Sequence, residues 1–317
     1  MNKNFTILIV DDVDKILLDK LNNAGFSIIY KPGLELDGVL QYIATVQGII
    51  LRSKVVADKK LIDLGINLKF IARVGAGMEI IDIPYAESKG IQCINSPEGN
   101  KDAVGEQAVG MLLSLLNNLN KADSEVRQKI WEREGNRGIE LLGKTVGIIG
   151  YGNMGSAFAR RLSGFGVKTI AYDKYKTNFS DAYAQEVSLQ TLQAEADVIS
   201  LHVPQTEETI YMIDKEFIAA CSKPFILINT ARGKVINTQD VVDAMKQNKI
   251  VGAALDVLEY ESFNFQDFMK EDMPEAFTYL VQSNRTILTP HIAGWTVESK
   301  TKLASVLADK IISRFSE

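Results

Sequence analysis

Short apolar runs alternate with helical patterns along most of the chain. The runs lack strict alternation of apolar and polar positions, which is typical of strands that are buried on both faces of a parallel sheet. They predict strands at Thr6–Val10, Ser27–Tyr30, Gly48–Leu51, Phe70–Arg73, Thr145–Ile149, Thr169–Tyr172, Val198–Leu201, Phe225–Asn229 and Gly252–Leu255. Strands separated by helical lengths of chain indicate a doubly wound α/β architecture.

The predicted strands fall into two groups, one before residue 95 and one after residue 144. A helical stretch connects them from about Ala103 to Ile130, and its first part, Ala103–Asn117, is apolar on almost every side, so we expect it to be buried against both domains. A further helix is expected at Val297–Phe315. We therefore expect two doubly wound parallel-sheet domains, Rossmann-like or flavodoxin-like, with a cleft between them. Residues 101–291 would form one, and residues 1–100 plus 292–317 a discontinuous other.

The composition excludes several classes of partner. The 35 basic and 40 acidic side chains give a net charge of −5 without a long run of either sign, which argues against nucleic acid and anionic membranes. The N-terminus does not resemble a signal peptide, and no segment reaches the roughly 18–20 consecutive apolar residues of a membrane helix. Cys93 and Cys221 match no metal-ligand spacing, so we expect small buried thiols and no metal site. We expect a soluble, cytoplasmic protein.

A glycine motif, Gly150-x-Gly152-x-x-Gly155, lies between a predicted strand and the helical pattern Ser156–Leu162. Such glycines permit a tight turn and a close approach of the backbone to a pyrophosphate at the helix N-terminus. The pattern arises often by chance, so its place between strand and helix carries the prediction of a dinucleotide site. Asp173 ends the next strand, where a carboxylate binds the adenine ribose and favours NAD over NADP. Lys174 weakens that preference, and the alternative is that Asp173 caps the strand end.

The chain has two histidines, His202 and His291. Hydride transfer at a hydroxyl or carbonyl carbon needs a proton donor and acceptor, a partner for it, and a cation. Suitable side chains follow predicted strands, whose carboxyl ends share one edge of a sheet, at Arg232, Asp256, Glu259, Glu261 and, after a short apolar run, His291. His202 follows the strand Val198–Leu201, and we expect it to shape the cofactor cleft rather than to move protons.

The motifs GYGNMG, SLHVPQTEET, INTARGKVI, GAALDVLEYE and TPHIAGW occur in this order. Together they resemble the D-isomer-specific 2-hydroxyacid dehydrogenase family over essentially the whole chain. The resemblance implies Arg232 as the anchor of the substrate carboxylate and carbonyl, His291 as the acid and base, and Glu261 as its partner, with Glu259 as the rival. A carboxylate beside His291 favours the imidazolium that donates a proton during reduction. The resemblance also implies that Asp256 faces the nicotinamide carboxamide. The other implied NAD contacts are Gly150, Gly152, Asn153, Met154, Gly155, Asp173, His202, Val203, Thr230 and Gly294.

The first domain offers a second group of candidate residues. Arg52 and Ser53 follow one predicted strand, and Gly75, Ala76 and Gly77 follow another, where successive N–H groups form an anion-binding nest or an ordinary glycine-rich turn. The segments ILRS, RVGAGMEIID, NSPEGN and WER most resemble the 3-phosphoglycerate dehydrogenases of the family. This implies phosphate binding at Arg52, carboxylate binding at residues 75–77, and a substrate site that includes Ser53. The implied reaction is the oxidation of 3-phosphoglycerate to 3-phosphohydroxypyruvate in serine biosynthesis.

The sequence departs from that narrower group in two places. Arg133 and Arg137 stand where many relatives have a lysine nearer to Trp131, and the segment between Glu261 and His291 is longer than usual. The chain ends at Glu317 without room for a regulatory domain, so serine feedback is not expected. The resemblance also implies a homodimer, formed through Ala103–Asn117 and the Trp131 segment.

Three alternatives are weighed against this function. A glyoxylate or hydroxypyruvate reductase would be indifferent to the phosphate of the substrate. Formate dehydrogenases have glutamine in place of the acidic partner of the histidine, and Glu261 argues against them. An NAD-sensing binding protein, such as a transcriptional corepressor on this fold, retains the catalytic residues and is distinguished by a lack of turnover.

Overall fold

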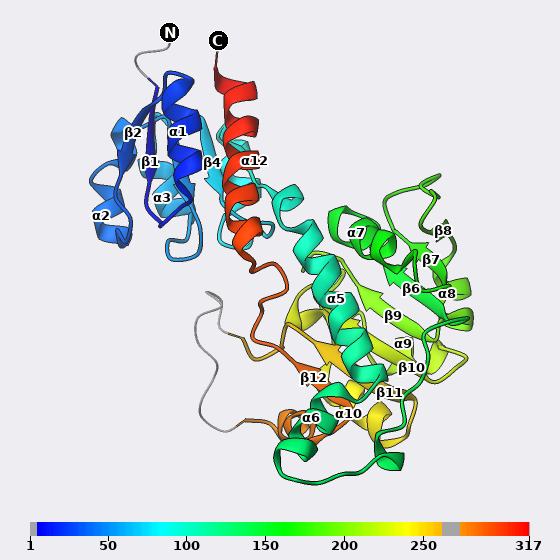
Figure 1. The fold of residues 1–317 in the computed structure, drawn as a ribbon. Coiled ribbons are helices and arrows are strands. Elements are labelled where there is room, and N and C mark those ends of the chain that lie inside the picture. The colour runs from blue at the N-terminus through cyan, green and yellow to red at the C-terminus, as the bar shows by residue number, and fades with distance from the viewer. Residues whose placement is uncertain (1–4, 262–272, 317) are drawn as a thin grey trace. The chain divides into compact units, whose positions relative to one another are not determined.

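The computed structural model describes residues 5–261 and 273–316. The chain divides into two compact units (Figure 1): unit 1 is residues 1–101 with 295–317, and unit 2 is residues 102–294. Residues 262–272, within the long segment before His291, lie outside the described residues.

Unit 1 is built on a parallel sheet with the strand order β2-β1-β3-β4-β5. The order reverses beside β1, and ligands of such sheets bind at this point, beyond the carboxyl ends of the strands. The strands are β1 (Thr6–Ile9), β2 (Ser27–Tyr30), β3 (Gly48–Leu51), β4 (Phe70–Arg73) and β5 (Gln92–Ile94). The helices are α1 (Lys15–Asn23), α2 (Leu36–Leu40), α3 (Lys59–Leu64), α4 (Ile83–Ser88) and α12 (Val297–Phe315).

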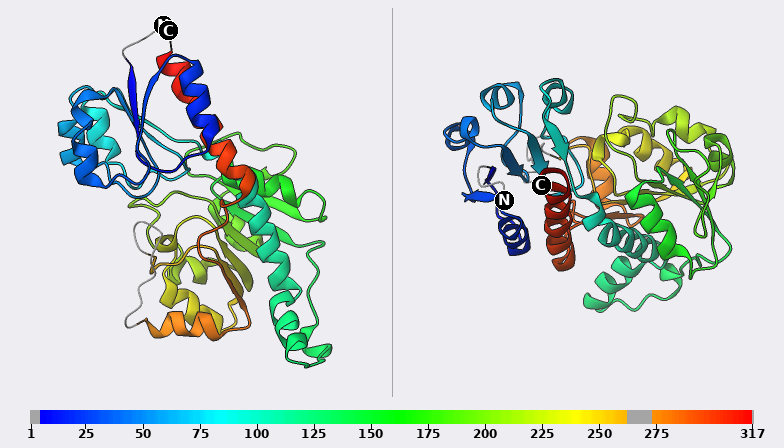
Figure 2. Two further views of the ribbon diagram at one scale, coloured as in Figure 1. Left: turned by 60° about the vertical axis from the view of Figure 1, so that its left-hand side comes forward. Right: turned by 90° about the horizontal axis from the view of Figure 1, so that it is seen from above.

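Successive side chains of a strand point to opposite faces of the sheet. Because the strands are apolar at successive positions, both faces of this sheet are apolar. Ile7 and Ile9 of β1 pack in a core that includes Leu307 and Ile311 of α12, whereas Leu8 belongs to the core on the other face. Figure 2 shows α1 and α12 side by side, so the C-terminal helix completes a face of the N-terminal sheet.

Unit 2 is built on a larger parallel sheet with the strand order β12-β11-β10-β9-β6-β7-β8. The strands are β6 (Thr145–Ile149), β7 (Lys168–Tyr172), β8 (Gln185–Glu186), β9 (Val198–Leu201), β10 (Phe225–Asn229), β11 (Ile250–Leu255) and β12 (Thr286–Leu288). The helices are α5 (Lys101–Leu116), α6 (Leu119–Arg127), α7 (Asn153–Leu162), α8 (Leu189–Glu195), α9 (Lys215–Ala220), α10 (Thr238–Lys246) and α11 (Glu275–Gln282). The order reverses between β6 and β9, which places the glycine motif and His202 at the switch point.

The sheet of unit 2 is also covered on both faces. Leu112 of α5 and Phe158 of α7 belong to one core, and Leu192 of α8 and Val241 of α10 belong to the other. The two-domain parallel α/β prediction is therefore confirmed.

The prediction of one helical stretch from Ala103 to Ile130 is wrong in one respect, because this part of the chain forms two helices, α5 and α6. Asn118 adopts a left-handed conformation with φ 51° and ends the first helix, a backbone geometry that asparagine tolerates better than most residues. Helix α6, which follows it, has no buried residue. Strands β5, β8 and β12 were not predicted, because two or three residues are too few to show a period.

The cysteines match the expectation in part. Cys221 is buried, whereas Cys93 is half-buried, and burial raises the pKa of each thiol to about 11. Among the described residues, no helix is long and apolar enough to cross a membrane.

Candidate active site

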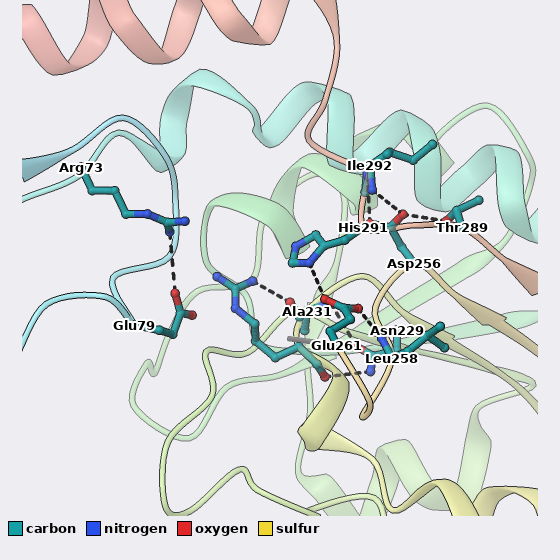
Figure 3. A network of polar contacts seen from close by, with 12 residues as sticks. Arg73, Glu79, Asn229, Ala231, Asp256, Leu258, Glu261, Thr289, His291 and Ile292 are labelled. Carbon is teal, nitrogen blue, oxygen red and sulfur yellow. Dashed lines mark hydrogen bonds and ion pairs between the residues drawn. The ribbon is translucent and has the colours of Figure 1, made fainter. Parts of the chain in front are cut away.

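The two residues expected to handle the proton are in contact (Figure 3). Nδ1 of His291 lies 2.8 Å from Oε2 of Glu261, and both side chains are largely shielded, at 25% and 17% exposure. The other oxygen of Glu261 accepts a hydrogen bond from the backbone N–H of Leu258. Because a carboxylate accepts hydrogen bonds, Nδ1 is the ring nitrogen that carries the proton toward Glu261.

Glu259, the rival partner, is bound elsewhere. Its Oε1 accepts a hydrogen bond of 2.7 Å from the Tyr211 hydroxyl, and its Oε2 accepts one of 3.1 Å from Thr238 N–H. The hydrogen bond to Glu259 raises the pKa of Tyr211 to about 12. The geometry therefore favours Glu261 as the partner of His291.

Asp256 holds the segment that carries His291. Its carboxylate accepts hydrogen bonds from the Thr289 hydroxyl at 2.6 Å and from the N–H groups of Ile292 and Ala293 at 2.9 Å. Its backbone carbonyl accepts the N–H of His291 at 2.8 Å. Asp256 is fully buried, and its side chain fixes this loop. Its contact with the nicotinamide carboxamide stays a prediction.

Arg232 follows β10 in a turn that a buried asparagine organises. Asn229 donates from Nδ2 to the Arg232 carbonyl at 2.9 Å and accepts at Oδ1 from Ala231 N–H at 3.0 Å. The next residue is Gly233, where a Cβ would lie 2.0 Å from the carbonyl oxygen of Leu258. This close approach brings the Arg232 turn against the segment that carries Glu261. Sequence reasoning missed Asn229 and Gly233, although a polar residue ending an apolar strand and a glycine after the arginine were the available signals.

The glycine motif forms the turn between β6 and α7. Gly150 has φ +92°, and a Cβ on Gly155 would lie 2.0 Å from the carbonyl oxygen of Gly150. A Cβ on Gly152 would meet nothing within 4 Å. The first and third glycines are thus required by the protein's own packing, while the second faces open space.

The same turn fits the phosphates of a dinucleotide. Gly152 is the N-cap of α7 and supplies no side-chain hydrogen bond, so the first-turn N–H groups, at Asn153, Met154 and Gly155, remain available to an anion. Two expected cofactor residues carry buried polar atoms without a hydrogen-bond partner in the described part of the chain, Nδ1 of His202 and Oγ1 of Thr230. Unsatisfied buried polar atoms are rare, and these two lie at residues that were expected to contact the cofactor.

His202 is unsuited to proton transfer. Its Nε2 lies 2.9 Å from the Ser200 hydroxyl, and burial lowers its pKa to about 3. The ring is therefore neutral near pH 7. Its neighbour Val203 contributes a side chain beside Gly150, as a lining residue would.

Asp173 at the end of β7 binds its own backbone turn. Its carboxylate accepts hydrogen bonds from the N–H groups of Tyr151, Tyr175 and Lys176, at 2.9, 3.0 and 3.1 Å. This is the capping role that the sequence left open. A carboxylate offers about four acceptor positions, so one remains for a ribose hydroxyl.

Unit 1 holds the second group of expected site residues, at the carboxyl ends of β3 and β4. The carbonyls of Gly75, Ala76 and Gly77 accept hydrogen bonds from Ser96 N–H, Asn95 Nδ2 and Arg73 Nη1, at 3.0, 2.6 and 2.5 Å. Their own N–H groups donate to no group in residues 5–261 and 273–316. The carbonyls of these residues are thus bound by other groups, while their three N–H groups have no partner among the described residues, as an anion nest requires.

Arg52 is linked to this turn through Arg73. Its carbonyl accepts Nε of Arg73 at 2.8 Å, so the guanidinium that holds Gly77 also holds Arg52. Arg73 itself is buried and pairs with Glu79 at 3.7 Å, as Figure 3 shows. Ser53, the other residue expected at this position, is half-buried. The described residues contain no cluster of His, Cys, Asp or Glu able to hold a metal ion.

Comparisons with known proteins agree with this geometry. The model of the "D-isomer specific 2-hydroxyacid dehydrogenase, NAD binding domain" matches residues 109–293. A hydroxypyruvate reductase of Thermotoga maritima is 34% identical over 97% of both chains. A D-3-phosphoglycerate dehydrogenase of Archaeoglobus fulgidus is 31% identical over 97% of this chain, which spans only 56% of that relative. The structure of a D-lactate dehydrogenase from Aquifex aeolicus, complexed with NAD and lactic acid, is 28% identical with a TM-score of 0.80, covering 98% of this chain and 95% of that one. The chain therefore belongs to the D-isomer-specific 2-hydroxyacid dehydrogenase family and is an NAD-dependent enzyme.

Proposed function

We propose that the protein interconverts 3-phosphoglycerate and 3-phosphohydroxypyruvate, a reaction of serine biosynthesis. The observation that carries this proposal is that the Arg73 guanidinium in unit 1 donates to the backbone carbonyls of both Arg52 and Gly77, which brings a residue with a cationic side chain close to the free N–H groups of residues 75–77. A substrate with both a phosphate and a carboxylate uses two such groups. Unit 1 would bind the substrate and unit 2 the dinucleotide.

The proposed chemistry uses three residues of unit 2, His291, Glu261 and Arg232. In the oxidative direction, Nε2 of His291 accepts the hydroxyl proton as the C–H bond breaks and the C=O bond forms. Bound NAD supplies the acceptor of the hydride. Glu261 accepts Nδ1–H and stabilises the imidazolium that results. Arg232, permanently charged and forked, binds the carboxylate and polarises the carbonyl. Reduction runs through the same groups in reverse.

A second candidate is the reduction of hydroxypyruvate or glyoxylate. The Thermotoga maritima relative, a hydroxypyruvate reductase, matches over nearly its whole length. A reductase of that kind would use the same unit 2 residues and gain nothing from a phosphate.

Substrate preference tests the proposal through Arg52. NADH absorbance is followed with 3-phosphoglycerate, D-glycerate, D-lactate, glyoxylate and hydroxypyruvate, for the wild type and Arg52→Ala. We expect the variant to raise KM for the phosphorylated substrate about 10- to 100-fold, because a charged hydrogen-bonding group contributes about 1.5–3 kcal/mol. KM for hydroxypyruvate should change less than about twofold.

Lys54→Ala is the matched control, because Lys54 is an exposed cation two residues from Arg52. An unchanged KM for the phosphorylated substrate in Arg52→Ala would reject the phosphate assignment. Turnover of hydroxypyruvate without any advantage from a phosphate would favour the reductase. No turnover with any substrate would favour an NAD-sensing binding protein.

We also propose a cytoplasmic homodimer. The free thiols Cys93 and Cys221 suit a reducing compartment. Helix α6 and the segment after it expose large apolar side chains, namely Leu119, Val126, Ile130, Trp131, Ile139 and Leu142, and Trp131 is 81% exposed. A second copy related by twofold symmetry would cover this surface.

The dimer proposal predicts that Trp131→Asp weakens self-association on the order of 100-fold or more, because exposed tryptophans dominate interfaces once buried. Sedimentation equilibrium measures the change. Ile66→Asp is the control, since Ile66 is similarly exposed but lies in unit 1. A wild-type protein that sediments as a monomer would contradict the proposal, as would an unaffected Trp131→Asp dimer.

A further inference from the structure

An exposed tryptophan of unit 1 lies against the arginine of the anion-binding group. The Cζ atom of Arg52 lies 4.5 Å from the centroid of the Trp295 ring. Trp295 is 69% exposed, so its indole is largely outside the hydrophobic core. Packing in the hydrophobic core therefore does not explain why a tryptophan stands at this position. Its contact with Arg52 points to another role.

The backbone of Arg52 is fixed independently of that contact. Its N–H donates to Oδ2 of Asp11 at 2.6 Å, and its carbonyl accepts from Arg73 at 2.8 Å. Asp11 and Arg73 are both buried. The backbone of Arg52 is therefore fixed. These contacts do not fix the position of its guanidinium.

The head of Arg52 is held by the indole. In the part of the chain that the structure describes, the Arg52 guanidinium has no carboxylate within ion-pair distance and no hydrogen-bond acceptor, in contrast to Arg161, which pairs with Asp102 at 2.7 Å. A ring stacked against a guanidinium contacts its face and leaves the N–H donors around its edge unused. The contact with Trp295 therefore orients the cation without consuming any of its donors.

We propose that Trp295 is a positioning residue that presents the edge of Arg52 to a phosphate monoester at the far end of the substrate. This inference rests on the proposed function and adds to it the residue that sets the preference for a phosphorylated substrate. Trp295 acts through Arg52 and does not itself touch the reacting atoms.

The kinetic test is a series at one position, Trp295→Phe and Trp295→Leu. We expect KM for 3-phosphoglycerate to rise about threefold with phenylalanine and about tenfold with leucine, since the attraction of a ring for a cation falls in that order. The kcat for this substrate and the KM for hydroxypyruvate should stay within about twofold of the wild type. The double variant Arg52→Ala with Trp295→Leu should bind no worse than Arg52→Ala alone, because the two residues act together.

Lys89→Met is the matched control, since Lys89 is another cation of unit 1 that stacks on an aromatic ring, 5.0 Å from that of Tyr85. It should leave KM for both substrates unchanged. Equal rises of KM for phosphorylated and unphosphorylated substrates in the Trp295 series would overturn the proposal. So would a fall of KM in Trp295→Leu, which would mean that the indole obstructs Arg52.

A fluorescence experiment separates this inference from the proposed function. The chain has two tryptophans, so Trp131→Phe leaves Trp295 as the sole indole. Inorganic phosphate should produce a saturable change in its emission, and adding Arg52→Gln should abolish that change. A phosphate response in a protein that oxidises no hydroxyacid would support the Arg52–Trp295 pair while the proposed reaction failed. No response in the single-tryptophan protein would reject the pair, whatever its activity.

Discussion

The His291→Ala variant is expected to bind NADH like the wild type and to lower kcat about 10²- to 10⁴-fold, the usual contribution of a positioned acid or base. In the proposed mechanism the imidazole exchanges the substrate proton, with Glu261 2.8 Å from Nδ1. Its loss removes an interaction that matters in the transition state, so kcat and kcat/KM should fall together. Single-turnover kinetics with saturating NAD and fluorescence titration with NADH separate the chemical step from binding.

Two glutamate variants sharpen this expectation. Glu261→Gln keeps the shape but removes the charge beside the imidazole, and we expect kcat to fall about 10- to 100-fold. Glu259→Gln is the control, because Glu259 binds Tyr211 and Thr238 rather than His291. Full turnover in His291→Ala would end the proposed mechanism, and a larger effect of Glu259→Gln than of Glu261→Gln would reverse the choice of partner.

The buried strands were predictable because a parallel sheet covered on both faces needs apolar side chains at successive positions. β3, β4, β6, β9 and β10 lie where the pattern placed them. The C-terminal helix was also predictable from its own period. The end of α5 before Asn118 was not predicted, because it depends on one residue with positive φ and residues 119–127 continue as a helix.

The contacts that organise the candidate sites were the least predictable part. Gly233 packs closely against the Leu258 carbonyl, and Arg73 donates a hydrogen bond to the Gly77 carbonyl. No local sequence pattern predicts either contact. Asp256 shows the limit most clearly. Its place at a strand end identified it as a site residue, but its role depends on loop N–H groups more than thirty residues away.

The glycine motif gives the second large expected effect, because its glycines serve different purposes. In Gly155→Ala the new methyl group would lie 2.0 Å from the carbonyl oxygen of Gly150, a backbone atom that cannot move without opening the turn. We expect the free energy of unfolding to fall by about 3 kcal/mol, at the upper end for overpacking, and NADH binding to be lost with the turn. Urea unfolding without cofactor and NADH titration measure the two effects.

Gly152→Ala is the matched comparison, with the same chemical change three residues earlier. Its methyl group would meet no protein atom within 4 Å, and the backbone there does not have positive φ. We expect unfolding to change by less than about 1 kcal/mol, while the Kd for NADH rises on the order of 100-fold, because the methyl group occupies space proposed for the pyrophosphate and separates it from the N–H groups of α7. Normal NADH affinity in Gly152→Ala would mean that the phosphates do not lie over this turn. If Gly155→Ala then lost stability while Gly152→Ala did not, Gly155 would serve only the packing of α7 on β6.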